Sequence, residues 1–202
     1  MQWMIKVAKK DPTSGITLPA DVRCVLNLSI GHPVAESYTT DPLCQASEQC
    51  WQNGIVVICS AGNGGRIQDT VNPSLNNEGY GTAYGSINSP GNDPYVITVG
   101  AMKDIDGVRN HDQVSTYSSR GPSRIDFVMK PDIVAPGNKV ISVDAGINSG
   151  TKAYAWLHQT YPGNIVPTSA YYSGKTPPTP AYYKLSGTSM AAPVVSGAVA
   201  MM

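Results

Sequence analysis

Charged residues are scarce in this sequence: the 202 residues carry 14 Lys and Arg and 14 Asp and Glu, or 14% in total. A chain without a basic excess lacks the charged surface that attracts nucleic acid or an anionic membrane. Long apolar runs are also missing, because even residues 193–202 are interrupted by Ser196 and Gly197. We therefore expect no nucleic-acid partner and no membrane span.

Cysteine is scarce as well, and the four cysteines are too few for a disulfide scaffold and lack zinc-ligand spacing. Cys24 and Cys59 lie in apolar runs, so we expect buried thiols that behave as small hydrophobes.

The sequence starts without the basic, apolar leader that directs export. What is present, 41% hydrophobic residues with 20 Gly and 16 Pro between short apolar runs, predicts one globular core with tight loops.

Two apolar runs flank a helix signal. Residues 23–30 (RCVLNLSI) and 55–60 (IVVICS) are typical of strands buried on both sheet faces. Between them, Asp41 predicts an N-cap, Pro42 the first helical position and Asn53-Gly54 the helix end. Strand, helix and strand in this order predict a parallel pair with a right-handed crossover.

Further elements are less regular. Residues 95–101 (YVITVGA) predict a third buried strand, and residues 139–143 a short one. Residues 114–118 predict an exposed or edge segment. The polar segment 64–90 is interpreted as a long surface excursion, and residues 146–181, rich in Tyr, Pro and Gly, as an insertion loop or hairpin.

A serine follows a glycine-containing turn where the last predicted helix begins, at about Ser189. Its small residues make this helix thin and apolar, as in a helix packed in the middle of a domain. The Ser189 hydroxyl would face outward beside unpaired N–H groups, and such fixed donors stabilise the oxyanion of acyl transfer. The alternative is that Ser189 only caps the helix, a role that serine often has. The motif alone leaves both interpretations open.

Several segments together resemble one family. Residues 187–193 (GTSMAAP) resemble the nucleophile motif of subtilisin-like serine proteases, and residues 60–63 (SAGN) resemble the segment with their oxyanion-hole asparagine. Residues 118–122 (SSRGP) and 130–137 (KPDIVAPG) resemble the family's connecting region, and residues 27–31 (NLSIG) the strand that lines its primary specificity pocket. The resemblance covers nearly the whole chain apart from the two loop segments named above.

The resemblance implies a three-layer α/β domain with a mostly parallel central sheet flanked by helices, of which residues 1–202 are a part truncated at both ends. It implies catalytic roles for Ser189, as nucleophile, and Asn63, as oxyanion donor. An asparagine at the carboxyl end of a parallel strand can donate into the crevice above the sheet. Alternatively, Asn63 adopts a left-handed turn before Gly64-Gly65.

Substrate binding follows from the same resemblance. Ser29, Ile30 and Gly31 on one side, with Ala61 and Gly62 on the other, would form pocket walls that an extended peptide joins as a strand. Without the motif order, each is equally an ordinary strand end. No charge lies at the base of this predicted pocket, so we expect it to accept apolar or aromatic side chains.

The sequence departs from the family in one respect, because the mechanism needs a histidine oriented by an aspartate, both earlier in the chain than the serine. Neither motif is present, and His32, His111 and His158 are interpreted as surface residues. Since the chain opens and stops in mid-helix, we favour a fragment of a serine endopeptidase that uses a Ser-His-Asp triad and an acyl-enzyme, with the Asp and His segments upstream. We then expect this piece alone to be inactive or nearly so. The alternative is a catalytically inactive, peptide-binding pseudoprotease.

Other classes fit less well, since Ala191 breaks the Gly-x-Ser-x-Gly motif of α/β-hydrolases and no Gly-x-Gly-x-x-Gly follows a strand. The predicted chemistry requires no cofactor and no metal ligands are assigned. Structural calcium sites are common in the family but have no readable spacing, and residues 91–93 (GND) are a candidate cation loop at most. The resemblance also implies a protein or peptide substrate, a propeptide, and a secreted or extracytoplasmic location.

Overall fold

The computed structural model describes two compact units. The larger combines residues 1–138 with 187–202, and the smaller comprises residues 139–186. The residues described are 1–19, 22–67, 80–144, 152–174 and 182–202.

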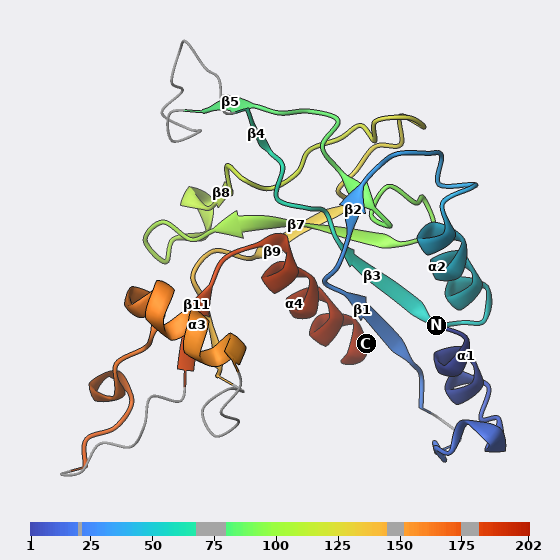
Figure 1. Ribbon diagram of the computed structural model, residues 1–202, viewed down its shortest axis with the longest axis horizontal. Helices are drawn as coiled ribbons and strands as arrows, with labels where there is room; N and C mark the ends of the chain where they lie inside the picture. Colours follow the sequence, from blue (N-terminus) through green and yellow to red (C-terminus); the bar gives the residue numbers. More distant parts are fainter. Residues whose placement is uncertain (20–21, 68–79, 145–151, 175–181) are drawn as a thin grey trace. The chain divides into compact units, whose positions relative to one another are not determined.

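A mostly parallel sheet forms the centre of the larger unit (Figure 1). Its parallel strands run in the order β1, β3, β7 and β9, and β7 also pairs with the short antiparallel β8. This arrangement confirms the predicted parallel pair and sheet. The strands are β1 (Val25–Leu28), β3 (Val56–Ser60), β7 (Ile97–Lys103), β8 (Gln113–Val114) and β9 (Ile133–Pro136).

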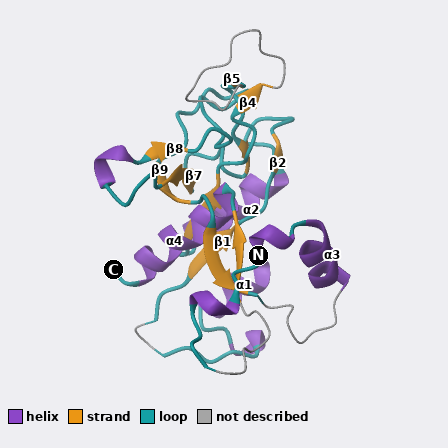
Figure 2. Cartoon of the chain, turned by 90° about the vertical axis from the view of Figure 1, so that its left-hand side faces the viewer, coloured by secondary structure: helices purple, strands orange, loops and turns teal. Residues whose placement is uncertain are grey.

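Helices cover both faces of this sheet, which gives three layers. Successive residues of a strand face opposite sides. Along β3, accordingly, Val57 and Cys59 pack on the side of α1 and α2, whereas Ile58 packs against Ala191 and Ala192 of α4. Figure 2 shows the same helices and strands from the side. The helices are α1 (Gln2–Ala8), α2 (Pro42–Gln52) and α4 (Thr188–Ala200).

Helix α2 begins and ends where the sequence predicts. The carboxylate of Asp41 accepts hydrogen bonds from the amides of Leu43 (2.8 Å) and Cys44 (3.2 Å), and Pro42 occupies the first turn. After the helix, Gly54 adopts a left-handed backbone (φ +77°) that glycine enters without a steric penalty. Local capping chemistry therefore determines both ends.

The sequence predicts that the thin helix α4 packs in the middle of the domain, and the structure shows this packing only on the side that faces the sheet. Ala191 and Ala192 are fully buried there, and small side chains let the helix approach β1, β3, β7 and β9 closely. On its other side, Val194 is 44% exposed in the described structure. The helix is therefore covered on one face, not surrounded.

Short connections complete the larger unit, and one prediction about them is wrong in part. The segment 64–90 was expected at the surface, but Ile87, Ser89 and Pro90 are buried, because its end pairs with the chain that follows β1. Residues 68–79 of this segment lie outside the described residues. In the predicted edge segment Val114 is exposed, whereas Ser115, Thr116 and Ser118 are buried. The additional pairs are β2 (His32–Pro33) with β6 (Asn88–Ser89), and β4 (Arg66–Ile67) with β5 (Gly81–Thr82).

The smaller unit contains an antiparallel strand pair, β10 (Val140–Val143) with β11 (Tyr182–Leu185). Within the segment interpreted as an insertion, α3 (Lys152–Thr160) is a helix that the sequence pattern did not indicate. Contacts from β11 hold its end, because the hydroxyl of Tyr183 donates to the carbonyls of Leu157 and Tyr161, each at 3.1 Å. Residues 145–151 and 175–181 lie outside the described residues.

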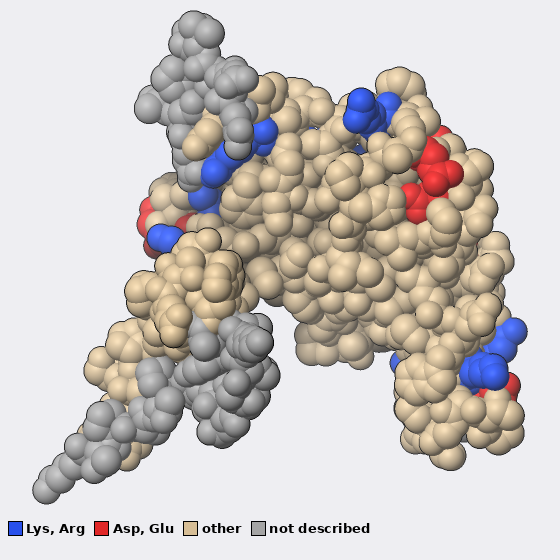
Figure 3. Space-filling model, viewed as in Figure 1, with Lys and Arg blue, Asp and Glu red and all other residues tan. Residues whose placement is uncertain are grey.

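The surface is poor in charge, as the composition predicts. On the face drawn in Figure 3, basic and acidic side chains form small, separate groups, and the middle of the surface is uncharged. None of the described helices has both the length and the apolar character needed to cross a membrane.

Candidate active site at the start of helix α4

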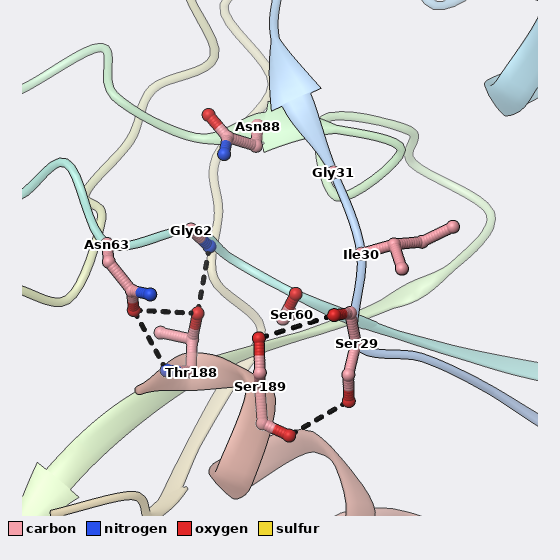
Figure 4. A pocket seen from close by; sticks show the side chains of 9 residues that line it. All are labelled: Ser29, Ile30, Gly31, Ser60, Gly62, Asn63, Asn88, Thr188 and Ser189. Carbon is pink, nitrogen blue, oxygen red and sulfur yellow. Dashed lines mark hydrogen bonds between the residues drawn. The ribbon is translucent and has the colours of Figure 1, made fainter. Parts of the chain in front are cut away.

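A cavity of about 350 Å³ lies where the carboxyl ends of β1 and β3 meet the first turn of α4 (Figure 4). In parallel sheets this edge is the usual place for a ligand, because loops and helix starts converge there. The cavity is lined by Ser29, Ile30, Gly31, Ser60, Gly62, Asn63, Asn88, Thr188 and Ser189.

Ser189 is the second residue of α4 and does not cap it. The N-cap position belongs to Gly187, and no side chain caps the helix. The hydroxyl of Ser189 instead donates to the carbonyl of Ser29 at 3.3 Å, at the edge of the cavity. The interpretation of Ser189 as a helix cap is therefore wrong.

The backbone amide of Ser189 has no acceptor within the described part of the chain. Its neighbours in the first turn are occupied: the Thr188 amide donates to the side chain of Asn63 (2.9 Å), and the amides of Met190 (3.0 Å) and Ala191 (3.4 Å) donate to the carbonyl of Gly187. One N–H at the positive end of the helix dipole thus remains available beside the Ser189 hydroxyl.

The side chain of Asn63 is held in one orientation. Its oxygen accepts from the amide (2.9 Å) and the hydroxyl (3.1 Å) of Thr188, so its Nδ2 is left without an acceptor among the described residues. Figure 4 shows this amide beside the start of α4. The left-handed turn here belongs to Gly62 (φ +102°), and Asn63 itself has no positive φ, so the turn interpretation of Asn63 is wrong.

Thr188, which is not among the predicted site residues, joins the two halves of the site. Its buried hydroxyl accepts from the Gly62 amide (3.1 Å) and donates to Asn63 (3.1 Å). The turn after β3 is therefore tied to the first turn of α4. The only local signal for this role is its position immediately before Ser189.

The predicted pocket walls come together with one exception. Ser29, Ile30, Gly31 and Gly62 line the cavity, whereas Ala61 is fully buried and does not. The backbone of Ala61 is occupied, because its amide donates to Val99 (2.9 Å) and its carbonyl accepts from Asn88 (3.0 Å).

Two polar residues of the cavity are not among the predicted pocket walls. Ser60 is the last residue of β3, and Asn88 comes from β6. Both add polar atoms to the lining of the cavity, which carries no charge. Asn88 enters from a separate segment, which sequence spacing could not reveal.

None of the three histidines lines the cavity, and each lies beside a carboxylate. The nitrogen–oxygen distances are 3.4 Å for His32–Asp41, 2.7 Å for His111–Asp106 and 2.6 Å for His158–Asp144. His32, the nearest of them in sequence to a cavity residue, points to the N-cap of α2. None of the residues that line the cavity is a group that can act as a general base for Ser189.

No metal site stands out, since the described residues contain no group of three or more His, Cys, Asp and Glu that could hold an ion. In the candidate cation loop, Asn92 and Asp93 are fully buried. Asp93 accepts a hydrogen bond from the amide of Tyr95 at 2.7 Å, and burial raises the pKa of its carboxyl to about 6. The cysteines are all free thiols, and burial raises the pKa of Cys44 to about 12.

Comparison with known proteins identifies the family. A model of the subtilase family matches residues 4–202, and the chain belongs to that family. The serine protease AprX of Bacillus subtilis (strain 168) is 30% identical over 205 residues, which cover 100% of this chain and 37% of AprX. Thermitase of Thermoactinomyces vulgaris is 28% identical over 190 residues, covering 94% of this chain and 44% of thermitase.

Solved structures agree on the fold. The S41 psychrophilic protease has a TM-score of 0.56 at 24% identity, covering 98% of this chain and 46% of that one. Sphericase has a TM-score of 0.53 at 23% identity, with 97% and 46% covered. At this identity the likeness supports the three-layer α/β fold alone. The chain spans less than half the length of each of these four proteins.

Proposed function

We propose that this chain carries the nucleophile of a serine endopeptidase. The Ser189 oxygen attacks the carbonyl carbon of a peptide bond, the amine leaves with a proton, and water then hydrolyses the acyl-enzyme. One observation carries the proposal: the Ser189 N–H and the Asn63 Nδ2 have no acceptors in the described structure, and both residues line the same cavity. Such a pair of fixed donors suits the oxyanion of the tetrahedral intermediate.

The proposal needs a base that takes the proton of Ser189. The present acceptor, the carbonyl of Ser29, cannot hold a proton at neutral pH. We propose that a histidine and its orienting aspartate come from sequence outside these 202 residues. The lengths of AprX and thermitase support this, because each is more than twice the stretch matched here.

The free edge of the sheet is a suitable place for the missing groups. Among the described strands, β1 pairs with β3 alone. A further parallel strand on its other edge would end beside Ser29 and Ser189, where strand ends usually place catalytic side chains. The substrate in this proposal is an extended peptide along residues 29–31, and the site of action is outside the cytoplasm, as the family resemblance suggests.

A fluorophosphonate probe tests the proposal, because it reacts covalently with activated serines. We expect labelling of the longest polypeptide that the reading frame encodes, loss of labelling in Ser189→Ala, and no change in Ser173→Ala, an exposed serine of the smaller unit. Asn63→Leu should slow peptide cleavage about 10²- to 10³-fold, the loss seen when subtilisin loses one oxyanion donor.

The 202-residue chain alone should label at least 100-fold more slowly, since it lacks the base. Equal labelling of the short chain would show that the base lies within it. A folded long polypeptide that never labels would overturn the enzyme proposal.

A further inference from the structure

Asn88 occupies the end of the cavity remote from Ser189. In Figure 4 it lies near Gly31 and Gly62, and its side chain makes no hydrogen bond with the other labelled residues. Its backbone is fixed, because β6 pairs with β2 and the Asn88 amide donates to the carbonyl of Ala61 at 3.0 Å. The carboxamide is thus held in place but has no partner within the described part of the chain.

The two glycines make room for this side chain. A Cβ at Gly62 would lie 2.9 Å from the Cγ and Nδ2 of Asn88, and a Cβ at Gly31 would lie 3.2 Å from its Cβ. Both distances are shorter than ordinary carbon contacts. The two glycines therefore accommodate Asn88, which limits the depth of the cavity.

The remaining lining is polar and uncharged. Ser60 is nearly buried, and its hydroxyl, like the Asn88 carboxamide, has no hydrogen-bond partner among the described residues. None of the nine lining residues carries a charge. An apolar substrate side chain would leave these groups unpaired, and a charged one would lose its hydration without gaining a counter-ion.

We propose that Asn88 determines specificity at this site and selects an uncharged, hydrogen-bonding side chain on the substrate residue that donates the scissile carbonyl. Glutamine represents this class, because it is long and its amide can both donate and accept. The selection rests on the proposed function, since the residue that fills this cavity precedes the bond that Ser189 attacks. A site built for hydrogen bonds discriminates strongly against an analogue that lacks the polar group.

Internally quenched peptides test the proposal in the longest encoded polypeptide. The peptides differ only in the residue before the scissile bond, which is Gln, Met, Leu, Glu or Lys. We expect kcat/KM for the Gln peptide to be about tenfold higher than for the Met peptide, whose side chain has nearly the same shape. The Gln peptide should exceed the Glu and Lys peptides by at least the same factor. Equal values for Gln and Met would overturn the proposal.

Asn88→Leu keeps the volume but removes the polar atoms, and it should reverse the order so that Met and Leu exceed Gln. Leucine is preferable to alanine for this test. Asn88 also lines a second, smaller cavity together with Arg124, and a small side chain at position 88 would let the two cavities join. If Asn88→Leu does not fold, Asn88→Asp tests the same position and should favour Lys over Gln. Asn110→Leu, an exposed asparagine outside the cavity, serves as the matched control and should leave the order unchanged.

Failure of this proposal differs from failure of the proposed function. If the fluorophosphonate labels Ser189 but Asn88→Leu leaves the Gln-to-Met ratio unchanged, the enzyme stands and the role of Asn88 falls. If no labelling occurs, the same peptides are tested for binding by fluorescence anisotropy. A Gln preference that Asn88→Leu abolishes would then still support the pocket assignment, and equal binding would overturn it.

Discussion

The hydroxyl of Ser29 donates to the carbonyl of Ser189 at 2.8 Å, and the hydroxyl of Ser189 donates to the carbonyl of Ser29 at 3.3 Å. These reciprocal bonds join residues 160 positions apart in sequence. The network extends further, because Asn27 donates to the Ser29 hydroxyl (2.9 Å) and accepts from Ser196 of α4 (2.9 Å). The end of β1 is thereby fixed against the first three turns of α4.

Ser29→Ala should weaken this connection. Removing the hydroxyl leaves the Ser189 carbonyl and the Asn27 amide without their partner, so we expect a loss of about 1 kcal/mol in the free energy of unfolding. Urea denaturation followed by tryptophan fluorescence measures the change. Ser29→Thr, which keeps the hydroxyl, should recover most of the loss, and equal stability of the alanine variant and the wild type would contradict the role given to this bond.

Gly62→Ala tests the close approach on the other side of the cavity. A Cβ there would lie 2.9 Å from Asn88 and from the hydroxyl of Ser119, at a backbone φ of +102° that side chains rarely adopt. We expect a loss of roughly 2–4 kcal/mol from strain and overpacking together.

Gly15→Ala is the matched control, because Gly15 also has a positive φ (+75°) but open space around it. It should cost only about 1 kcal/mol in thermal or urea unfolding. Equal losses in the two variants would show that backbone strain alone, and not contact with Asn88, explains the glycine at position 62.

The sequence predicts best what local chemistry determines. Both ends of α2 follow from Asp41, Pro42 and Gly54, because a cap and a left-handed terminus act within one turn. Ser189 and Asn63 were also found, since each lies in a short motif, and the structure brings both to one cavity.

The sequence fails where distant segments meet. Asn88 reaches the cavity through the pairing of β6 with β2, and Thr188 matters through bonds to Gly62 and Asn63 more than 120 residues away. Near the end of helix α3, the carbonyl of Leu157 accepts a hydrogen bond from Tyr183 of β11. Tertiary contacts of this kind leave no periodicity to detect.

Lys130 provides an internal positive charge near the sheet. Its side chain is 2% exposed, and its ammonium donates to the carbonyl of Val96 (2.8 Å) and to Asp132 (2.7 Å).

Lys130→Met should lower the free energy of unfolding by roughly 2–3 kcal/mol, because the Val96 carbonyl loses its donor. Asp132 loses less, because it still accepts from the amide of Thr98 and is accessible to water. Urea unfolding at pH 7 measures this, with the exposed Lys9→Met as a control expected to change stability by less than about 0.5 kcal/mol. A neutral effect of Lys130→Met would show that the buried charge is dispensable.

Asp93 should make stability depend on pH. Burial is the main cause that raises its pKa from 3.8 to about 6, with Glu48 and Asp41 adding to the rise. Well below pH 3.8 the carboxyl is protonated in both folded and unfolded chains. Between pH 3.8 and about 6 the unfolded chain releases the proton while the folded chain keeps it, so stability falls as the pH rises and the loss is complete above about pH 6.

Asp93→Asn removes this titration and keeps an oxygen for the Tyr95 amide. Relative to the wild type, the variant should gain on the order of 1–3 kcal/mol in unfolding free energy between pH 4 and pH 7.5. Urea denaturation at these two pH values measures the gain, and Asp104→Asn, an exposed carboxyl, should show none. A pH-independent difference between Asp93→Asn and the wild type would mean that Asp93 has the same pKa in the folded and unfolded chains and that burial does not control its charge.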